Sequence, residues 1–208
     1  MTMSLTKCER FNLSESLAAL STKELIKAYG GWNEGHFEFR TGEHGNGWIN
    51  KMEFLRYPEV MNEMGRRLAA QYSDLKDEIE VVMGPSYIGS IIAYSAASHL
   101  NVPFSLTYRD HRDGGIIKMH RGFALRPGTK ILFVDDFVFT GTDLKDNVGA
   151  LQNAGMNVIG ASVIGVRNNI ELGVTIKSLM EVNFIKTTKE NCRMCIEGID
   201  ITATNVRE

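Results

Sequence analysis

The stretch ILFVDDFVFTGTD, residues 131–143, indicates which fold class the chain adopts. Its first four residues are apolar and typical of a buried strand, and two adjacent carboxylates, Asp135 and Asp136, follow where that strand is expected to end. A short loop with Gly141 then opens a helix that we predict over residues 142–154. A buried strand that leads directly into a helix is the building unit of α/β proteins, so the stretch predicts that class.

Short apolar runs at residues 79–83, 103–108 and 158–166 extend this pattern to both sides of the stretch. Helical patterns, such as the one over residues 88–100, separate most of these runs. The alternation predicts an α/β fold in which a parallel sheet is flanked by helices. Since ligands of such sheets bind at the carboxyl ends of the strands, a site is expected in the turns that leave them.

The N-terminal part of the chain has a different pattern. The segment STKE, residues 21–24, is a capping box that restarts a helix within residues 12–29. A Gly-rich turn over residues 41–47 separates two strand-like runs and predicts a hairpin, and a helix with Pro58 in its first turn follows it. We expect these segments to form a small N-terminal hood of helices and a hairpin.

Length and composition indicate one globular domain. The chain has 208 residues, of which 43% are hydrophobic and 23% are charged, as is usual for a folded domain of this size. We expect a single domain in three parts: the hood over residues 1–57, an α/β core over residues 58–185 and a C-terminal tail over residues 186–208.

The charge balance and the apolar runs exclude several classes of protein. A formal net charge of −2 gives no bulk attraction to nucleic acid or to an anionic membrane. No apolar run is long enough to span a bilayer, and Lys7, Glu9 and Arg10 interrupt any signal-peptide core. We therefore expect a cytoplasmic protein whose partners are small molecules, with no nucleic acid and no membrane among them.

The turn after the acidic pair has the groups that would hold a phosphorylated sugar. The first N–H groups of the following helix, with Gly141 and the hydroxyls of Thr140 and Thr142, can receive a phosphate. Carboxylates would repel a phosphate alone, but Asp135 and Asp136 can accept hydrogen bonds from ribose hydroxyls, directly or through hydrated Mg²⁺. The acidic pair alone also resembles the magnesium strand of P-loop nucleoside triphosphatases, yet neither G-x-x-x-x-G-K-[ST] nor G-x-G-x-x-G occurs in the chain.

A second turn, MGPSYIGS over residues 83–90, follows another predicted strand and leads into a helix. Its glycines allow backbone amides to converge on a second anion, for which a pyrophosphate is the candidate. The residues that would line it are Gly84, Pro85, Ser86, Tyr87 and Gly89.

These segments resemble the type I phosphoribosyltransferases, and the orotate phosphoribosyltransferases in particular. Residues 131–143 look like the family's phosphoribosyl-pyrophosphate (PRPP) motif, and residues 83–89 are similar to its pyrophosphate loop. The segment GHFEFRTG, residues 35–42, is similar to a Gly-x-Phe segment of the family. Residues 121–123 and the ending CRMCIEGI, residues 192–199, resemble a prokaryotic branch of it.

The resemblance implies Mg²⁺-dependent transfer of ribose 5-phosphate from PRPP to a planar acidic nitrogenous base, with orotate as the favoured acceptor, in a homodimer. It also implies roles for residues outside the two turns. Base binding falls to Arg40, Trp48, Ile49 and Arg167, and catalysis, beside Asp135 and Asp136, to a loop with Arg109, His111, Arg112 and Lys118. The loop is shorter than the family's, Ile88 stands where many orotate enzymes carry Lys, and Asp143 stands where a small hydroxyl residue is expected.

Alternatives to these roles stay open. Trp48 can equally be a core residue, and the alternating charges of the loop also suit a solvent-facing surface. Asp143 either turns away from the phosphate or weakens its binding. For the whole chain, the alternatives are transfer to a different base and a non-catalytic regulator that binds PRPP or a nucleotide.

The three cysteines fit a reducing compartment, since they are odd in number and show no disulfide-framework spacing. Cys192 and Cys195 form a Cys-x-x-Cys pair, but two ligands do not make a zinc site, and neither a second pair nor a His-x-x-x-His partner occurs. Metal binding, redox chemistry and a structural tail are the three alternatives, and we favour the tail. We interpret His36, His99 and His120 as packing or surface residues.

Overall fold

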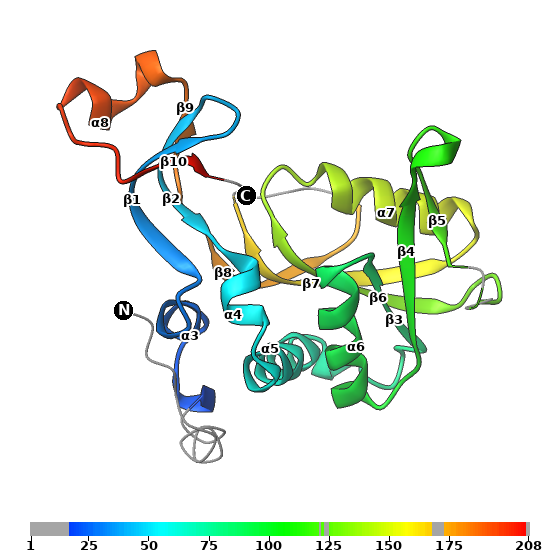
Figure 1. The fold of residues 1–208 in the computed structure, drawn as a ribbon. Helices are drawn as coiled ribbons and strands as arrows, with labels where there is room; N and C mark the ends of the chain where they lie inside the picture. The colour runs from blue at the N-terminus through cyan, green and yellow to red at the C-terminus, as the bar shows by residue number, and fades with distance from the viewer. Residues whose placement is uncertain (1–16, 121, 123–124, 168–172, 207–208) are drawn as a thin grey trace. The chain divides into compact units, whose positions relative to one another are not determined.

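The computed structural model describes residues 17–120, 122, 125–167 and 173–206 (Figure 1). It divides into two compact units. The core unit comprises residues 61–182, and the hood unit comprises residues 1–60 together with residues 183–208. The C-terminal tail, which we expected as a third part, therefore belongs to the same unit as the N-terminal hairpin. Arg121 and Phe123 lie outside the described residues.

The core unit contains a six-stranded sheet of order β5-β4-β3-β6-β7-β8. All neighbouring strands are parallel except β5, which runs antiparallel to β4. The predicted α/β fold with a parallel sheet is confirmed. The strands are β3 (Val81–Pro85), β4 (Phe104–Asp110), β5 (Ile116–Met119), β6 (Lys130–Val138), β7 (Asn157–Val166) and β8 (Ile176–Glu181).

Helices cover both faces of this sheet. On one face, Leu144, Val148 and Leu151 of α7 (Thr142–Asn153) pack in a buried cluster with Ile131 and Phe133. On the other face lie α5 (Pro58–Ala70) and α6 (Ile88–Leu100), which approach each other closely, since a Cβ on Gly65 would collide with Ser95. Successive residues of β7 face the two helix layers in turn, as the alternation of side chains along a strand requires. Ala161 packs in the buried cluster with α7, and the hydroxyl of Ser162 donates to Leu68 O of α5 at 2.9 Å.

The central strand β6 is longer than the sequence predicts. We expected it to end at Val134, but it pairs with β7 through Asp135↔Val163 and on to Val138↔Val166. The expectation that the acidic pair follows the strand is therefore wrong. Asp135 and Asp136 lie inside the ladder, because hydrogen bonding to β7 and burial of Phe137 and Val138 extend the strand past the charges.

The hood unit is built on a four-stranded sheet of order β10-β1-β2-β9. The predicted hairpin is confirmed as β1 (Trp32–Phe39) and β2 (His44–Ile49), with a turn shorter than expected. The short strands β9 (Lys186–Thr187) and β10 (Ala203–Val206) come from the C-terminal tail. Phe37, Phe39 and Val206 form a small buried cluster against which Trp48 packs.

Short helices complete both units. The predicted capping box is confirmed at α3 (Thr22–Ala28), where the Ser21 hydroxyl accepts from Glu24 N and the Glu24 carboxylate accepts from Ser21 N. Along the parts of the chain that the structure describes, no helix combines the length and apolar character needed to cross a membrane. The described residues also form the helices α4 (Lys51–Leu55), η1 (Ser73–Leu75), η2 (His111–Asp113), η3 (Lys189–Asn191) and α8 (Arg193–Ile196).

Candidate functional site

The acidic pair has two different environments. Asp136 is buried, with 6% of its surface exposed, and its carboxylate accepts a hydrogen bond from the Phe137 N–H. Asp135 is half-buried, and its Oδ1 accepts from the Asp136 N–H at 2.8 Å. The Asp135 carboxylate is therefore the more accessible of the two to a ligand.

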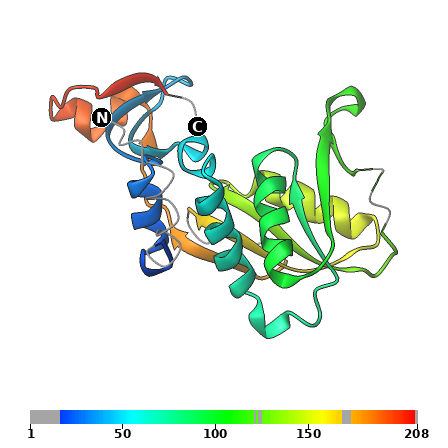
Figure 2. The ribbon, with the colours of Figure 1, turned by 60° about the horizontal axis from the view of Figure 1, so that its bottom comes forward.

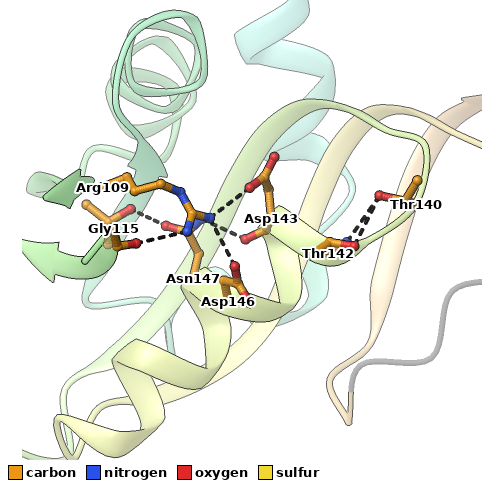
Figure 3. A network of polar contacts seen from close by, with 8 residues as sticks. Arg109, Gly115, Thr140, Thr142, Asp143, Asp146 and Asn147 are labelled. Carbon is orange, nitrogen blue, oxygen red and sulfur yellow. Dashed lines mark hydrogen bonds and ion pairs between the residues drawn. The ribbon is translucent and has the colours of Figure 1, made fainter. Parts of the chain in front are cut away.

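The turn between β6 and α7 has the form of an anion receptor. Gly141 adopts the left-handed conformation, with φ of 79°, directly before the first helical residue Thr142. The hydroxyls of Thr140 and Thr142 are 3.3 Å apart in exposed side chains (Figure 3). The first N–H groups of α7 and the two hydroxyls therefore gather hydrogen-bond donors at the positive end of the helix dipole.

The turn between β3 and α6 lies directly beside the acidic pair. Tyr87 has a left-handed backbone with φ of 71° and is exposed, and Ser90 Oγ donates to Tyr87 O at 2.6 Å. A Cβ added to Gly89 would lie 2.7 Å from Asp135 Oδ1 and 2.6 Å from Pro85 Cγ. Gly89 thus lets the start of α6 approach the Asp135 carboxylate, and the two turns predicted to bind anions meet at the same edge of the sheet.

The predicted catalytic loop is a β-hairpin formed by β4, η2 and β5, which extends beyond the rest of the core unit (Figure 2). Arg109 pairs with Ile117 one residue before the strand β4 ends, and its Nη1 donates to Gly115 O of the hairpin turn at 2.9 Å. Its Nη2 donates to Asp143 Oδ1 at 2.9 Å and to Asp146 Oδ2 at 3.0 Å (Figure 3). The hydrogen bonds to Asp146 and Asp143 raise the pKa of Arg109, which therefore stays charged.

Lys118, on the second strand of the hairpin, is also paired with acids. Its Nζ lies 2.7 Å from Asp113 Oδ2 and 3.0 Å from Asp110 Oδ2. The hydrogen bonds to Asp113 and Asp110 raise the pKa of Lys118, and the Lys118 hydrogen bond lowers the pKa of Asp110. His111 and Arg112 are exposed at the tip. Because exposed ion pairs are worth only about 0–1 kcal/mol, a polyanionic ligand could replace the acids at little cost.

Sequence reasoning missed the side chains that attach the hairpin to α7. Asn147 Nδ2 donates to Asp143 O at 2.7 Å, and its Oδ1 accepts from the buried Thr107 hydroxyl of β4. Asp143, Asp146 and Asn147 lie at positions i, i+3 and i+4 of α7 and so share one helix face. This spacing in the sequence indicates a polar face on α7, but it does not identify Arg109 as the residue that contacts that face.

Arg167 follows β7 at the same edge of the sheet. Its backbone N–H donates to Val138 O at 2.9 Å, and its guanidinium lies 4.6 Å from the centre of the Phe139 ring. This cation–π contact holds the side chain over the residue that precedes Thr140. Arg167 therefore contacts Val138 and Phe139, two residues that lie in sequence between the acidic pair and Thr140.

Comparison with known sequences identifies the family. Residues 56–185 match the profile of the phosphoribosyl transferase domain. The chain belongs to the phosphoribosyltransferase family. Orotate phosphoribosyltransferase of Pelotomaculum thermopropionicum is 31% identical over 177 residues, which are 84% of this chain and 90% of that protein. The protein of the same name from Thermotoga maritima is 30% identical over 179 residues, 85% of this chain and 93% of its own.

Solved structures agree with this assignment at the level of the fold. The orotate phosphoribosyltransferase of Aeropyrum pernix has a TM-score of 0.65 at 20% identity and covers 78% of this chain and 94% of its own. The chain is therefore a pentosyltransferase enzyme with the fold of the type I phosphoribosyltransferases.

The remaining predicted base-binding residues of this phosphoribosyltransferase lie in the hood unit. Arg40 has an exposed side chain, and its N–H donates to Val206 O at 3.0 Å. Trp48 packs on the cluster of Phe37 and Phe39, and Ile49 is buried. These contacts give Trp48 a packing role within the hood unit, and the base-binding roles of Arg40, Trp48 and Ile49 stay predictions.

Proposed function

We propose that this phosphoribosyltransferase transfers ribose 5-phosphate from PRPP to orotate in a Mg²⁺-dependent reaction, giving orotidine 5′-phosphate and pyrophosphate. The observation that supports it is the juxtaposition of Gly89 with the Asp135 carboxylate, which sets a second anion-binding turn beside the acidic pair. PRPP carries a phosphate and a pyrophosphate on one ribose, and two such turns flanking carboxylates match that distribution. The name shared by the relatives supports orotate as the acceptor.

Each group in the site has an assigned task in this proposal. Thr140, Gly141, Thr142 and the first amides of α7 bind the 5′-phosphate. The turn of Gly84, Pro85, Ser86, Tyr87 and Gly89 binds the pyrophosphate. Asp135 accepts hydrogen bonds from the ribose hydroxyls, and the carboxylate of buried Asp136 accepts from the Phe137 N–H within β6.

The acidic pair also suits Mg²⁺, which takes oxygen ligands and keeps several waters. Asp135 and Asp136 would hold the hydrated ion beside the ribose hydroxyls. When bound, Mg²⁺ neutralises charge that develops on the departing pyrophosphate. Displacement at C1′ passes through a cationic sugar, so the chain supplies positioning and charge and needs no covalent nucleophile.

The hairpin completes the charge balance in this proposal. Arg109 and Lys118 exchange their carboxylate partners for pyrophosphate oxygens, Arg112 adds a further positive charge, and His111 gives a proton to the leaving group. Arg167, a planar fork that lies over the Phe139 ring, pairs with the carboxylate of orotate. Arg40, Trp48 and Ile49 contact the base. We further propose that the enzyme acts as a cytoplasmic homodimer.

The test is to mix the purified chain with PRPP, MgCl₂ and orotate and to follow the loss of orotate absorbance. The proposal expects turnover, and it expects a chelator to lower the rate on the order of 10²-fold or more. Pyrophosphate release with another base, but not with orotate, would overturn the acceptor and keep the transferase.

A second candidate is a regulator that binds PRPP without turnover. The acid pairing of Arg109 and Lys118 favours it, because both cations are engaged within the chain. Calorimetric binding of PRPP, together with the absence of pyrophosphate release for every base in a panel, would replace the enzyme with the regulator.

A further inference from the structure

Four side chains that are far apart in the sequence meet in the hood unit: His36, His44, Cys192 and Cys195. One ligand atom from each lies within 4.8 Å of all the others. Cys195 Sγ is 3.5 Å from His36 Nε2 and 3.3 Å from His44 Nδ1, and Cys192 Sγ is 3.5 Å from His36 Nε2. The two ring nitrogens are 2.9 Å apart.

These separations are close to those around one tetrahedral metal ion. With Zn–S near ~2.3 Å and Zn–N near ~2.0 Å, two ligands of a tetrahedron lie roughly 3.3–3.8 Å apart. The sulfur–nitrogen distances match that range, and a shift of a few tenths of an ångström would bring the nitrogen pair into it. Two nitrogens and two sulfurs in a tetrahedral arrangement are typical of zinc.

The hydrogen bond on the far side of the His36 ring fixes which nitrogen faces the cluster. His36 Nδ1 lies 2.7 Å from Ile199 O, and a carbonyl oxygen only accepts, so Nδ1 carries the hydrogen. In the neutral ring, Nε2 then has a lone pair directed at the sulfurs. A metal-binding histidine usually donates its second ring N–H to a carbonyl or carboxylate in this way.

Burial makes a single bound cation the simplest partner for the group. His36, His44 and Cys192 are each at most 2% exposed. Two thiolates and one Zn²⁺ sum to zero charge, so the ion satisfies the four ligand atoms, three of them from buried residues, without leaving a net charge inside the unit. The chain also supplies the usual Cys-x-x-Cys ligand spacing, since Cys192 is the N-cap of α8 and Cys195 lies within its single turn.

The position of the cluster suggests what the metal does. It would join α8 to the hairpin of β1 and β2, and α8 has no buried residue of its own among its four described positions. Ile196 is 75% exposed and Ile199 is 48% exposed, so apolar burial holds this segment weakly. Small units with little core commonly depend on a metal or a disulfide.

We propose that His36, His44, Cys192 and Cys195 form a structural zinc site that ties the C-terminal segment to the N-terminal hairpin. The site is independent of the proposed transferase reaction, because none of the four ligands is among the residues assigned to binding of PRPP or of the base. A structural role fits the closed set of four protein ligands, which leaves no position for a substrate.

The first test needs no variant. The full chain, purified under reducing conditions without a histidine tag, should contain about one zinc per chain by mass spectrometry of the metal. Replacing zinc with Co²⁺ should give the intense visible d–d bands of a tetrahedral site and a sulfur-to-cobalt band in the near ultraviolet. Less than ~0.2 zinc per chain together with an octahedral cobalt spectrum would overturn the proposal. So would a Cys192–Cys195 disulfide in the purified, metal-free protein.

Variants then identify the ligands. Cys195→Ser and His44→Asn should each lose zinc at a chelator concentration that leaves the parent chain loaded, and they should unfold at lower temperature. Cys8→Ser and His99→Asn, which remove a cysteine and a histidine that are not among the four proposed ligands, should keep their zinc. If a ligand variant fails to fold, removing zinc from the parent chain must by itself expose the C-terminal segment to limited proteolysis, with protection returning on zinc addition. Unchanged proteolysis would refute the structural role.

Discussion

The Arg109 guanidinium of the hairpin lies 2.9 Å from the Asp143 carboxylate in the first turn of α7. Asp143 is the residue whose negative charge is out of place beside a phosphate-binding turn, and the structure directs that charge at Arg109 (Figure 3). The pair therefore answers the alternative that the sequence left open, since the Asp143 side chain turns towards the hairpin. It also makes binding of PRPP compete with an internal contact.

Asp143→Asn should lower the KM for PRPP by about 2- to 5-fold, because the Asp143 carboxylate competes with the PRPP phosphate for the N-terminus of α7. A negative charge at that end of a helix is worth about 0.3–1 kcal/mol. Steady-state kinetics with varied PRPP measure this. Asp77→Asn, an exposed acid after η1, is the matched control and should leave KM unchanged. A KM that rises would show that Asp143 helps binding, contrary to this interpretation.

The acidic pair should respond unequally to removal of charge. Asp135→Asn should reduce kcat/KM for PRPP by roughly 10²-fold with little change in Tm, since the half-buried Asp135 carboxylate is the more accessible of the two to the ribose. Asp136→Asn should lower Tm as well, because a buried carboxylate that accepts the Phe137 N–H is lost. Thermal unfolding and kinetics on both variants separate the roles. Equal kinetic losses without any change in Tm would contradict the division.

Much of the core unit could be predicted because its signals are local. The helix over residues 88–100 has the predicted bounds, since buried Ile92, Ala93 and Ala96 follow the helical period after a Gly-rich turn. Pro58 begins α5 as expected. Strand β6 was predicted too short, because periodicity cannot show that β7 continues to supply hydrogen-bond partners beyond Val134.

The candidate site could be predicted only where one segment carries it. The two turns are contiguous in sequence, but the pairing of Arg109 with Asp143 spans 34 positions and depends on how α7 lies against β4. The cysteine pair was interpreted as a tail because its histidine partners do not share its segment. Their contact arises from the fold of the hood unit, where β1 and β2 bring His36 beside His44.

Glu63 should contribute to stability in a pH-dependent manner. Burial by itself raises the pKa of Glu63, but hydrogen bonds from Arg66 and Arg67, at 2.7 Å and 2.6 Å, outweigh it and lower the pKa below 4.5. A lowered pKa in the folded state gives stability that is present above the unfolded value and is lost as pH falls through the folded value. The Tm advantage of the parent over Glu63→Gln should therefore shrink from about pH 5 to pH 3. Glu181→Gln, at the exposed end of β8, is the control, and its Tm should follow that of the parent over this pH range. A difference in Tm between the parent and Glu63→Gln that stays constant with pH would contradict the assignment.

Gly89→Ala tests whether the closeness of the two turns matters for binding. The new Cβ would lie 2.7 Å from Asp135 Oδ1 and 2.6 Å from Pro85 Cγ, so the start of α6 must move away from the acidic pair. We expect kcat/KM for PRPP to fall on the order of 10²-fold, since small displacements of positioning groups are costly. Gly149→Ala is the matched control, because nothing lies within 4 Å of a Cβ added at this position of α7. Replacing a mid-helix Gly with Ala stabilises a protein by about 0.5–1 kcal/mol, so Tm should rise by a few degrees while the kinetics stay unchanged. Parent-like kinetics in Gly89→Ala would mean that PRPP is not held between these turns.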